Sequence, residues 1–213
     1  MHDLTDERKL KNLSGALRIS FEASKGQLMS QTFIQGVSAL VKSKKIKHSH
    51  TIEKVKIICG DTSIMFKKYI LCSISDVFRA MFENPNNIEA QNGVVCLEDI
   101  DPNIIKAFER FFNACSINEE DLTAGMLLFA DRYNIQPIVK LCLKHLRNNI
   151  TKENFVEIAK ASDLINDKDL LQAAANFVTK NIGTFEDDPD VRNFMRSNPE
   201  CFSKVLEIMM FKK

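Results

Sequence analysis

Apolar residues recur along this chain with two different periods, one typical of helices and one typical of strands. Over residues 32–42 they follow helical spacing, so we expect a helix there. Further along, Val55, Ile57 and Cys59 occupy every second position, which predicts a half-buried strand. Gly60-Asp61 then supplies a turn, and the residues after it can return as the second strand of a hairpin.

Helical spacing dominates the rest of the chain. Residues 69–82 predict one helix, Asn84–Asn87 predict a loop, and Val94–Leu97 predict a short buried strand. Beyond this strand we expect only helices, and the helix capped by Asp167 should end at Gly183. The expected helix starts carry capping or proline signals, and they are Asp101-Pro102, Asp121, Pro137, Thr151, Asp167, Asp188-Pro189 and Asn198-Pro199.

Several segments of this pattern resemble one family in the same order. The string from Ile70 to Phe82 resembles the BTB/POZ signature K-x-I-L-x-x-x-S-x-V-F-x-x-M-F. Val95–Leu97, Asp99–Pro102 and Ala130–Ile135 resemble the strand, the helix start and the A-D-K-Y helix that follow it in that family. Thr151–Asp163 resembles the first helix of the BACK-type extension found after many such domains.

The resemblance implies an α+β protein. It predicts a BTB/POZ fold, with a small β-sheet flanked by helices, over residues 51–150 and an all-α BACK-like extension over 151–213. Residues 1–50 are expected to form an N-terminal segment that includes the helix at 32–42. The pattern is most similar to the speckle-type POZ (MATH-BTB) proteins, but residues 1–50 are too short to hold the MATH domain that reads substrates in them.

The resemblance also implies a function in protein interaction: a homodimeric adaptor for a cullin-type ubiquitin ligase. The helix at 32–42 matches the position of the family's dimerising helix, although its apolar stripe could also serve as a core within one chain. The expected dimer face is formed by Phe33, Ile34, Val37 and Leu40. The candidates for cullin binding are Phe82, Ile88, Glu89, Asn113 and Phe155.

The chain departs from the family pattern at three places, of which the missing glutamate of the cullin-binding loop favours an alternative, a BTB oligomerisation or scaffold protein without cullin binding. Lys67-Lys68 replaces the usual His-Lys, and Asn113-Ala114-Cys115 replaces Tyr-Thr-Gly. The apolar-x-Glu motif of cullin-binding members becomes Ile88-Glu89-Ala90, which lacks the final glutamate. A lost carboxylate would remove a charge-assisted hydrogen bond of about 1.5–3 kcal/mol.

Composition narrows the choice of partners. The 29 Lys and Arg against 28 Asp and Glu give a net charge of only +1, so the chain lacks the positive field that nucleic-acid binding uses. The basic run Lys42–His50 reads as a solvated linker, or alternatively as a nuclear-targeting or phosphate-contacting segment. No stretch is apolar enough to span a membrane, and the N-terminus has no signal sequence. Six scattered cysteines in apolar surroundings suit reduced thiols in the cytoplasm or the nucleus.

No catalytic or cofactor-binding motif is found, so we expect neither an enzyme nor a cofactor. His48 and His50 lack the further ligands that a zinc site needs, so no metal site is predicted. Acidic runs such as Glu119–Asp121 precede helices, where they oppose the helix dipole favourably. The expected partners are a second copy or a related BTB protein, a cullin scaffold and an unidentified substrate protein, with no nucleic acid and no membrane.

Overall fold

The computed structural model describes residues 53–114, 117–185 and 188–210, and the chain forms two compact units. The sheet unit runs to Asp121 and includes Tyr133–Pro137. The helical unit comprises Leu122–Arg132 and the residues from Ile138 onward. The predicted helix at 32–42 lies outside the described residues.

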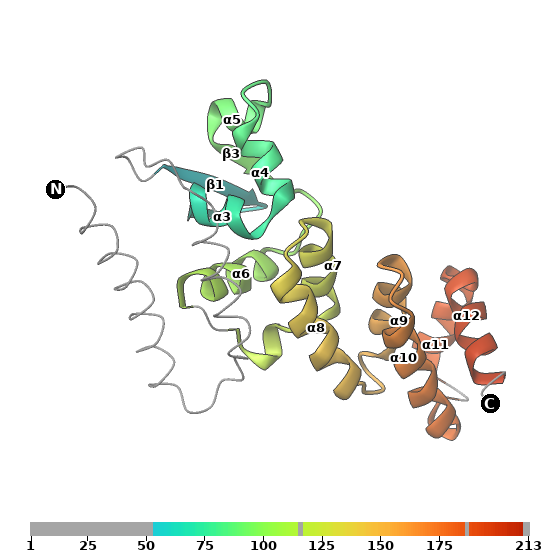
Figure 1. The fold of residues 1–213 in the computed structure, drawn as a ribbon. Helices are drawn as coiled ribbons and strands as arrows, with labels where there is room; N and C mark the ends of the chain where they lie inside the picture. The colour runs from blue at the N-terminus through green and yellow to red at the C-terminus, as the bar shows by residue number, and fades with distance from the viewer. Residues whose placement is uncertain (1–52, 115–116, 186–187, 211–213) are drawn as a thin grey trace. The chain divides into compact units, whose positions relative to one another are not determined.

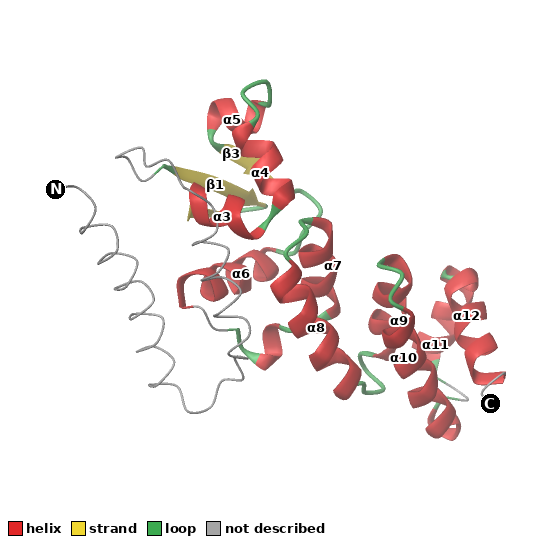
Figure 2. Cartoon of the chain, viewed as in Figure 1, coloured by secondary structure: helices red, strands yellow, loops and turns green. Residues whose placement is uncertain are grey.

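A three-stranded sheet with the order β2-β1-β3 forms the centre of the sheet unit (Figures 1 and 2). β1 (Lys54–Cys59) pairs antiparallel with β2 (Thr62–Lys67) and parallel with β3 (Val94–Cys96). These strands confirm the prediction made from the alternating apolar positions. The hairpin turns on Gly60, whose φ of +54° is accessible to glycine at little cost.

One face of the sheet is packed and the other is open, because side chains alternate along each strand. Val55, Ile57 and Cys59 of β1 are at most 1% exposed. Their neighbours on the same face, Ile64 of β2 and Val95 of β3, are also buried. The opposite positions of all three strands are exposed or half-buried.

Four helices complete the part of the sheet unit that the structure describes. They are α3 (Lys68–Ile74), α4 (Asp76–Glu83), α5 (Ile88–Asn92) and α6 (Pro102–Ala114), followed by the short 3-10 helix Glu119–Asp121. α3 and α6 pack against β2. The contact of α6 is aromatic, since the Phe66 ring of β2 lies 5.3 Å from that of Phe108 and 5.0 Å from that of Phe112.

The single helix predicted over residues 69–82 is wrong, because two helices meet at Ser75. Ser75 has an extended backbone, with φ −137° and ψ 118°, which ends α3 and begins α4. Its side-chain oxygen accepts a hydrogen bond from the Phe78 amide at 3.0 Å, as a helix N-cap does. The apolar spacing of the two short helices is nearly continuous, so periodicity alone did not locate the break.

The helical unit contains only helices among the residues that the structure describes. They are α7 (Ala124–Arg132), α8 (Gln136–Asn148), α9 (Phe155–Leu164), α10 (Lys168–Lys180), a 3-10 helix (Ile182–Thr184), α11 (Pro189–Ser197) and α12 (Pro199–Met210). The first residues of α8 belong to the sheet unit.

Five phenylalanine rings join the C-terminal helices. Phe155 of α9 lies between Phe185, at 5.6 Å, and Phe194 of α11, at 6.2 Å. Phe185 in turn contacts Phe177 of α10, and Phe194 contacts Phe202 of α12. Aromatic pairs at these distances add to the burial of apolar area, so this chain of rings ties α9, α10, α11 and α12 into one core.

The predicted helix starts are partly confirmed. The carboxylates of Asp101, Asp167 and Asp188 accept hydrogen bonds from amides at the beginning of α6, α10 and α11. Asp121 does not open α7: the helix begins at Ala124, where the Thr123 hydroxyl accepts from the Met126 amide.

Two further predictions of helix ends are wrong. α9 begins at Phe155 rather than at Thr151, because residues 151–154 form a turn in which the Asn154 side chain accepts from the Thr151 amide. α10 ends at Lys180, three residues before Gly183, and the side chain of Asn181 donates to the Phe177 carbonyl at the end of the helix. Local hydrogen bonds of asparagine therefore set both ends.

The architecture confirms the predicted α+β class, with a small sheet and its helices followed by a helical extension. In the described part of the chain, no helix combines the length and the apolarity needed to cross a bilayer.

Ser75 should be the most sensitive hydroxyl of the sheet unit. Ser75→Ala removes the α4 cap and an inter-segment hydrogen bond to the Tyr133 carbonyl, and we expect it to lower the free energy of unfolding by about 2–4 kcal/mol. Ser73→Ala is the matched control, since this hydroxyl only donates to Ile70 one turn earlier and should matter by less than about 1 kcal/mol. Urea unfolding followed by circular dichroism compares the two. Equal losses would contradict the anchoring role of Ser75.

Candidate functional site

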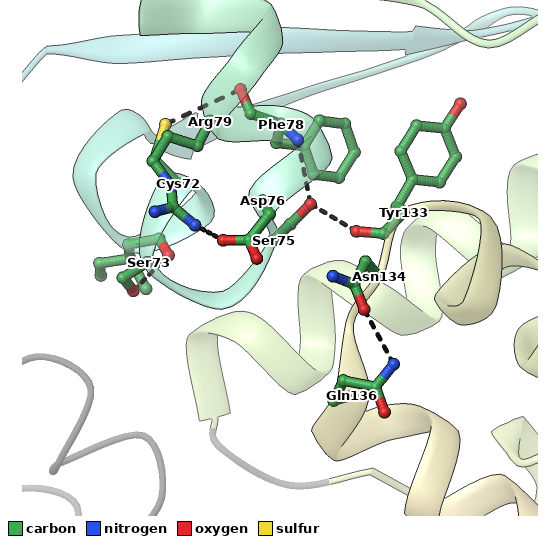
Figure 3. A network of polar contacts seen from close by, with 10 residues as sticks. Cys72, Ser73, Ser75, Asp76, Phe78, Arg79, Tyr133, Asn134 and Gln136 are labelled. Carbon is green, nitrogen blue, oxygen red and sulfur yellow. Dashed lines mark hydrogen bonds and ion pairs between the residues drawn. The ribbon is translucent and has the colours of Figure 1, made fainter.

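The segment that resembles the BTB/POZ signature is fixed to the rest of the sheet unit through Ser75. Its hydroxyl donates to the carbonyl oxygen of Tyr133 at 2.5 Å while accepting from the Phe78 amide (Figure 3). The Phe78 ring stacks on the Tyr133 ring, with centroids 4.6 Å apart and planes within 8°. One polar and one aromatic contact therefore join two motifs that lie 58 residues apart in the sequence.

Around this junction the backbone of Asn134 adopts the left-handed conformation, with φ +51°. Asparagine tolerates this region better than most residues, and here its side-chain oxygen accepts a hydrogen bond from Gln136 at 2.8 Å. The turn carries the chain from Tyr133 into α8 (Figure 3). An ion pair between Asp76 and Arg79 lies on the first turn of α4.

The loop after α4 is held by its own asparagines. The Asn87 side chain donates to the carbonyls of Ala80, at 2.9 Å, and Met81, at 3.4 Å, near the end of α4. The Asn84 side chain accepts from the Asn86 amide, and the Gln91 side chain donates to the Pro85 carbonyl. These bonds give the predicted loop a defined shape.

The loop leads into α5, which presents an isolated apolar side chain. Ile88, the first residue of α5, is 66% exposed. Glu89 and Ala90 follow it and are half-buried. α5 packs against α4 and β3, and it ends at Gly93, whose amide donates to the Glu89 carbonyl at 2.8 Å. Ile88 therefore stands on an ordered support.

Two of the other candidates for cullin binding are core side chains. Phe82 is 1% exposed and packs beside Phe78, so its side chain belongs to the core of the sheet unit. Phe155 is also 1% exposed and lies in the phenylalanine core of the helical unit. Asn113 lies in α6. Of the candidates whose side chains the structure describes, the adjacent Ile88 and Glu89 are the two that have exposed surface.

The four residues of the predicted dimer face, Phe33, Ile34, Val37 and Leu40, lie outside the described residues. So does the basic run at Lys42–His50.

Most thiols of the described chain are core side chains. Cys59, Cys72, Cys142 and Cys201 are buried, and none of them is in a disulfide. Burial raises the pKa of Cys72 to about 11 and that of Cys142 to about 12, so both remain protonated at neutral pH. Cys96 corrects the expectation of a uniformly buried set, because it faces away from the core on β3 and is exposed.

Among the described residues, no group of three or more His, Cys, Asp or Glu side chains could hold a metal ion. His145 is half-buried on α8, and its ring contacts the Asn149 side chain at 3.3 Å. This contact with the residue that follows α8 gives the ring a structural partner.

Asn87 should control the order of α5. Asn87→Ala removes both side-chain bonds to the end of α4, so we expect the amides of Gln91 and Gly93 to exchange with deuterium about tenfold faster. Asn86→Ala is the control in the same loop, since Asn86 donates its hydrogen bond to Asn84 from the main-chain amide. Hydrogen exchange followed by mass spectrometry measures the difference. Unchanged protection in Asn87→Ala would show that packing alone holds α5.

Comparison with known protein families gives a match over half of the chain. The model of the BTB/POZ domain matches residues 44–150. The chain is 27% identical over 154 residues to BTB and MATH domain-containing protein 42 of Caenorhabditis elegans, covering 71% of this chain and 38% of that protein. It is 25% identical over 181 residues to Kelch-like protein 41a of Danio rerio, covering 83% and 29%.

A third relative is the human Kelch-like protein 28, 24% identical over 155 residues, which cover 72% of this chain and 26% of that protein. The chain thus spans 26–38% of the length of these three relatives. The family model reaches through α8, whereas the contacts within the structure group α7 and most of α8 with the later helices. On the matched domain, and on a fold that has the sheet and helices expected of it, the chain belongs to the BTB/POZ family.

Proposed function

We propose that this chain is a BTB adaptor that recruits a cullin-type ubiquitin ligase scaffold and works as a homodimer. It acts by binding, and the substrate protein would be brought by a partner or by a further domain. The support comes from the family, from its BTB-MATH and Kelch-like relatives and from one exposed surface on α5.

The observation that carries the proposal is the exposure of Ile88. A single exposed aliphatic side chain is common on protein surfaces. Ile88, which is 66% exposed, differs because it begins a helix, and hydrogen bonds from the side chains of Asn84, Asn87 and Gln91 fix the loop before it. A preordered apolar anchor loses little conformational entropy on binding. Burying it in a partner would contribute about 1.5–3 kcal/mol.

Ala90 supports the second candidate, a BTB scaffold that does not bind a cullin. The position is half-buried beside the exposed Ile88, and its methyl group can neither accept a hydrogen bond nor carry charge. The family motif places a glutamate here. A cullin contact built on Ile88 without that glutamate would be weaker by about 1.5–3 kcal/mol.

Cullin binding is tested at two positions of α5. The full chain is titrated by calorimetry against the N-terminal half of a BTB-binding cullin. Ile88→Ser should weaken binding roughly 10- to 100-fold, because it removes the apolar anchor while leaving the exposed helix start intact. Ala90→Glu should strengthen binding roughly tenfold or more, because it supplies the missing carboxylate.

Leu164→Ser is the matched control, since Leu164 is 74% exposed at the end of α9 and should not affect binding. Binding that appears only in Ala90→Glu would favour the scaffold. A chain that binds in neither form would rule out the cullin role.

Dimerisation through the N-terminal helix has its own test. Val37→Asp combined with Leu40→Asp places two charges in the proposed apolar face, so a folded monomer is expected because buried charges without partners are strongly unfavourable. Light scattering gives the mass, and circular dichroism checks the fold. A dimer that survives both substitutions would exclude this face.

A further inference from the structure

The sheet has an outer face, opposite the core, on which none of the described strand side chains is buried. Alternation along the strands places eight side chains on the side opposite the core. All of them are exposed or half-buried. This outer face consists of Lys54, Lys56 and Ile58 on β1, Ser63, Met65 and Lys67 on β2, and Val94 and Cys96 on β3.

The pairing of the strands arranges these side chains in three rows. Lys54 lies opposite Lys67 in the first row. Lys56 lies between Met65 and Val94 in the second row. Ile58 lies between Ser63 and Cys96 in the third row. Positive charge therefore gathers at one end of the face, and apolar side chains continue from it across all three strands.

Three apolar side chains surround Lys56 on this face. Met65, which is 50% exposed, and Val94, which is half-buried, flank Lys56 in the second row, and the half-buried Ile58 lies diagonally from both in the third row. Diagonal neighbours on adjacent strands are within reach of long side chains. A contiguous apolar patch on a protein surface marks an interaction site more often than single exposed residues do.

The lysines of this face have no counter-charge in the described chain. Lys54, Lys56 and Lys67 form no ion pair with any residue that the structure describes. The next lysine, Lys68, is by contrast paired with Glu53 at 2.7 Å. Near the ends of the strands, the acidic side chains are Glu53, which precedes β1 and pairs with Lys68, Asp61 in the turn and Glu98 after β3.

We propose that the outer face of the sheet binds an acidic segment of a partner protein, whose carboxylates meet the three lysines and whose apolar side chains cover Ile58, Met65 and Val94. The unpaired lysines select for negative charge, since complementary charge increases the rate and specificity of association. The aliphatic rows select for a peptide rather than a nucleic acid, because they offer no aromatic side chain on which a base could stack.

This surface is distinct in its residues from the α5 surface assigned to the cullin. None of the eight side chains belongs to α5, and Ile88 is not one of them. The chain could therefore hold an acidic partner segment whether or not it binds a cullin.

Binding is measured with a defined probe. The probe is a short, fluorescein-labelled, acetylated peptide in which glutamates alternate with pairs of leucines. Its anisotropy is followed as the full chain is added. A version with glutamine in place of glutamate, and a version with serine in place of leucine, test the two halves of the proposal. We expect each version to bind roughly tenfold more weakly than the probe.

Variants of the chain locate the contact. Lys56→Glu and Met65→Ser should each weaken binding of the probe roughly three- to tenfold, because one reverses a charge and the other removes apolar area at exposed positions. Lys106→Glu is the matched control: it reverses an exposed lysine of the same unit, on α6 and outside the face, and should leave the affinity unchanged.

Cys96 gives an independent readout, because its thiol is exposed on the face whereas the other described thiols are buried. In a Cys115→Ser background, bound probe should slow the alkylation of Cys96 by iodoacetamide severalfold.

Three outcomes would overturn the proposal. One is equal affinity for the glutamine version or the serine version of the probe. Another is a loss of binding in Lys106→Glu as large as that in Lys56→Glu, which would reveal a general charge effect. The third is a single-stranded oligonucleotide that binds more tightly than the probe and protects Cys96, which would assign the face to nucleic acid.

Discussion

The sheet unit depends on one buried hydroxyl. Ser75 is 1% exposed, and its oxygen both accepts from the first turn of α4 and donates to the carbonyl of Tyr133. A buried hydroxyl that satisfies two main-chain groups lets two segments distant in sequence meet without leaving a polar atom unpaired. With that junction fixed, Phe78 stacks on Tyr133, α4 has one orientation, and the loop that begins at its end carries α5 to a defined place.

Sequence patterns could predict the strands and most helices because these follow from periods within a few residues. Val55, Ile57 and Cys59 alternate and are buried as expected, and Asp167 caps α10 as expected. The errors arose where a local hydrogen bond overrode the period. Ser75 splits an apolar run that reads as one helix, and Asn154 holds residues 151–154 in a turn where Thr151 was expected to begin α9. Asp121 pairs with Arg110, and this interaction across 11 residues leaves no mark in local spacing.

The candidate site was harder to predict than the fold, since a family motif shows which residues recur but not which side of a helix each one occupies. Phe82 and Ile88 lie six positions apart near the same loop, yet one is 1% exposed and the other 66%. Phe82 follows Phe78 by one helical turn, which places both on the buried side of α4. That spacing was a usable signal in the sequence. The hydrogen bonds that fix the loop before Ile88 were not, because they depend on the end of α4 being in place.

Packing in the core constrains the residues on one face of the sheet but not those on its outer face. The core positions of β1 must stay apolar because they are buried. Val55, for example, lies opposite Phe66 of β2, whose ring packs against Phe108 of α6. The positions between the core positions meet no such demand, yet they hold lysines that form no ion pair with the described residues, together with the half-buried Ile58 and the exposed Met65. Solubility alone would favour mixed charge and few aliphatic residues on such a surface. The outer face departs from this expectation in both respects, which fits a surface that a partner covers. Because the face is positively charged and apolar, the partner that covers it should be negatively charged and apolar.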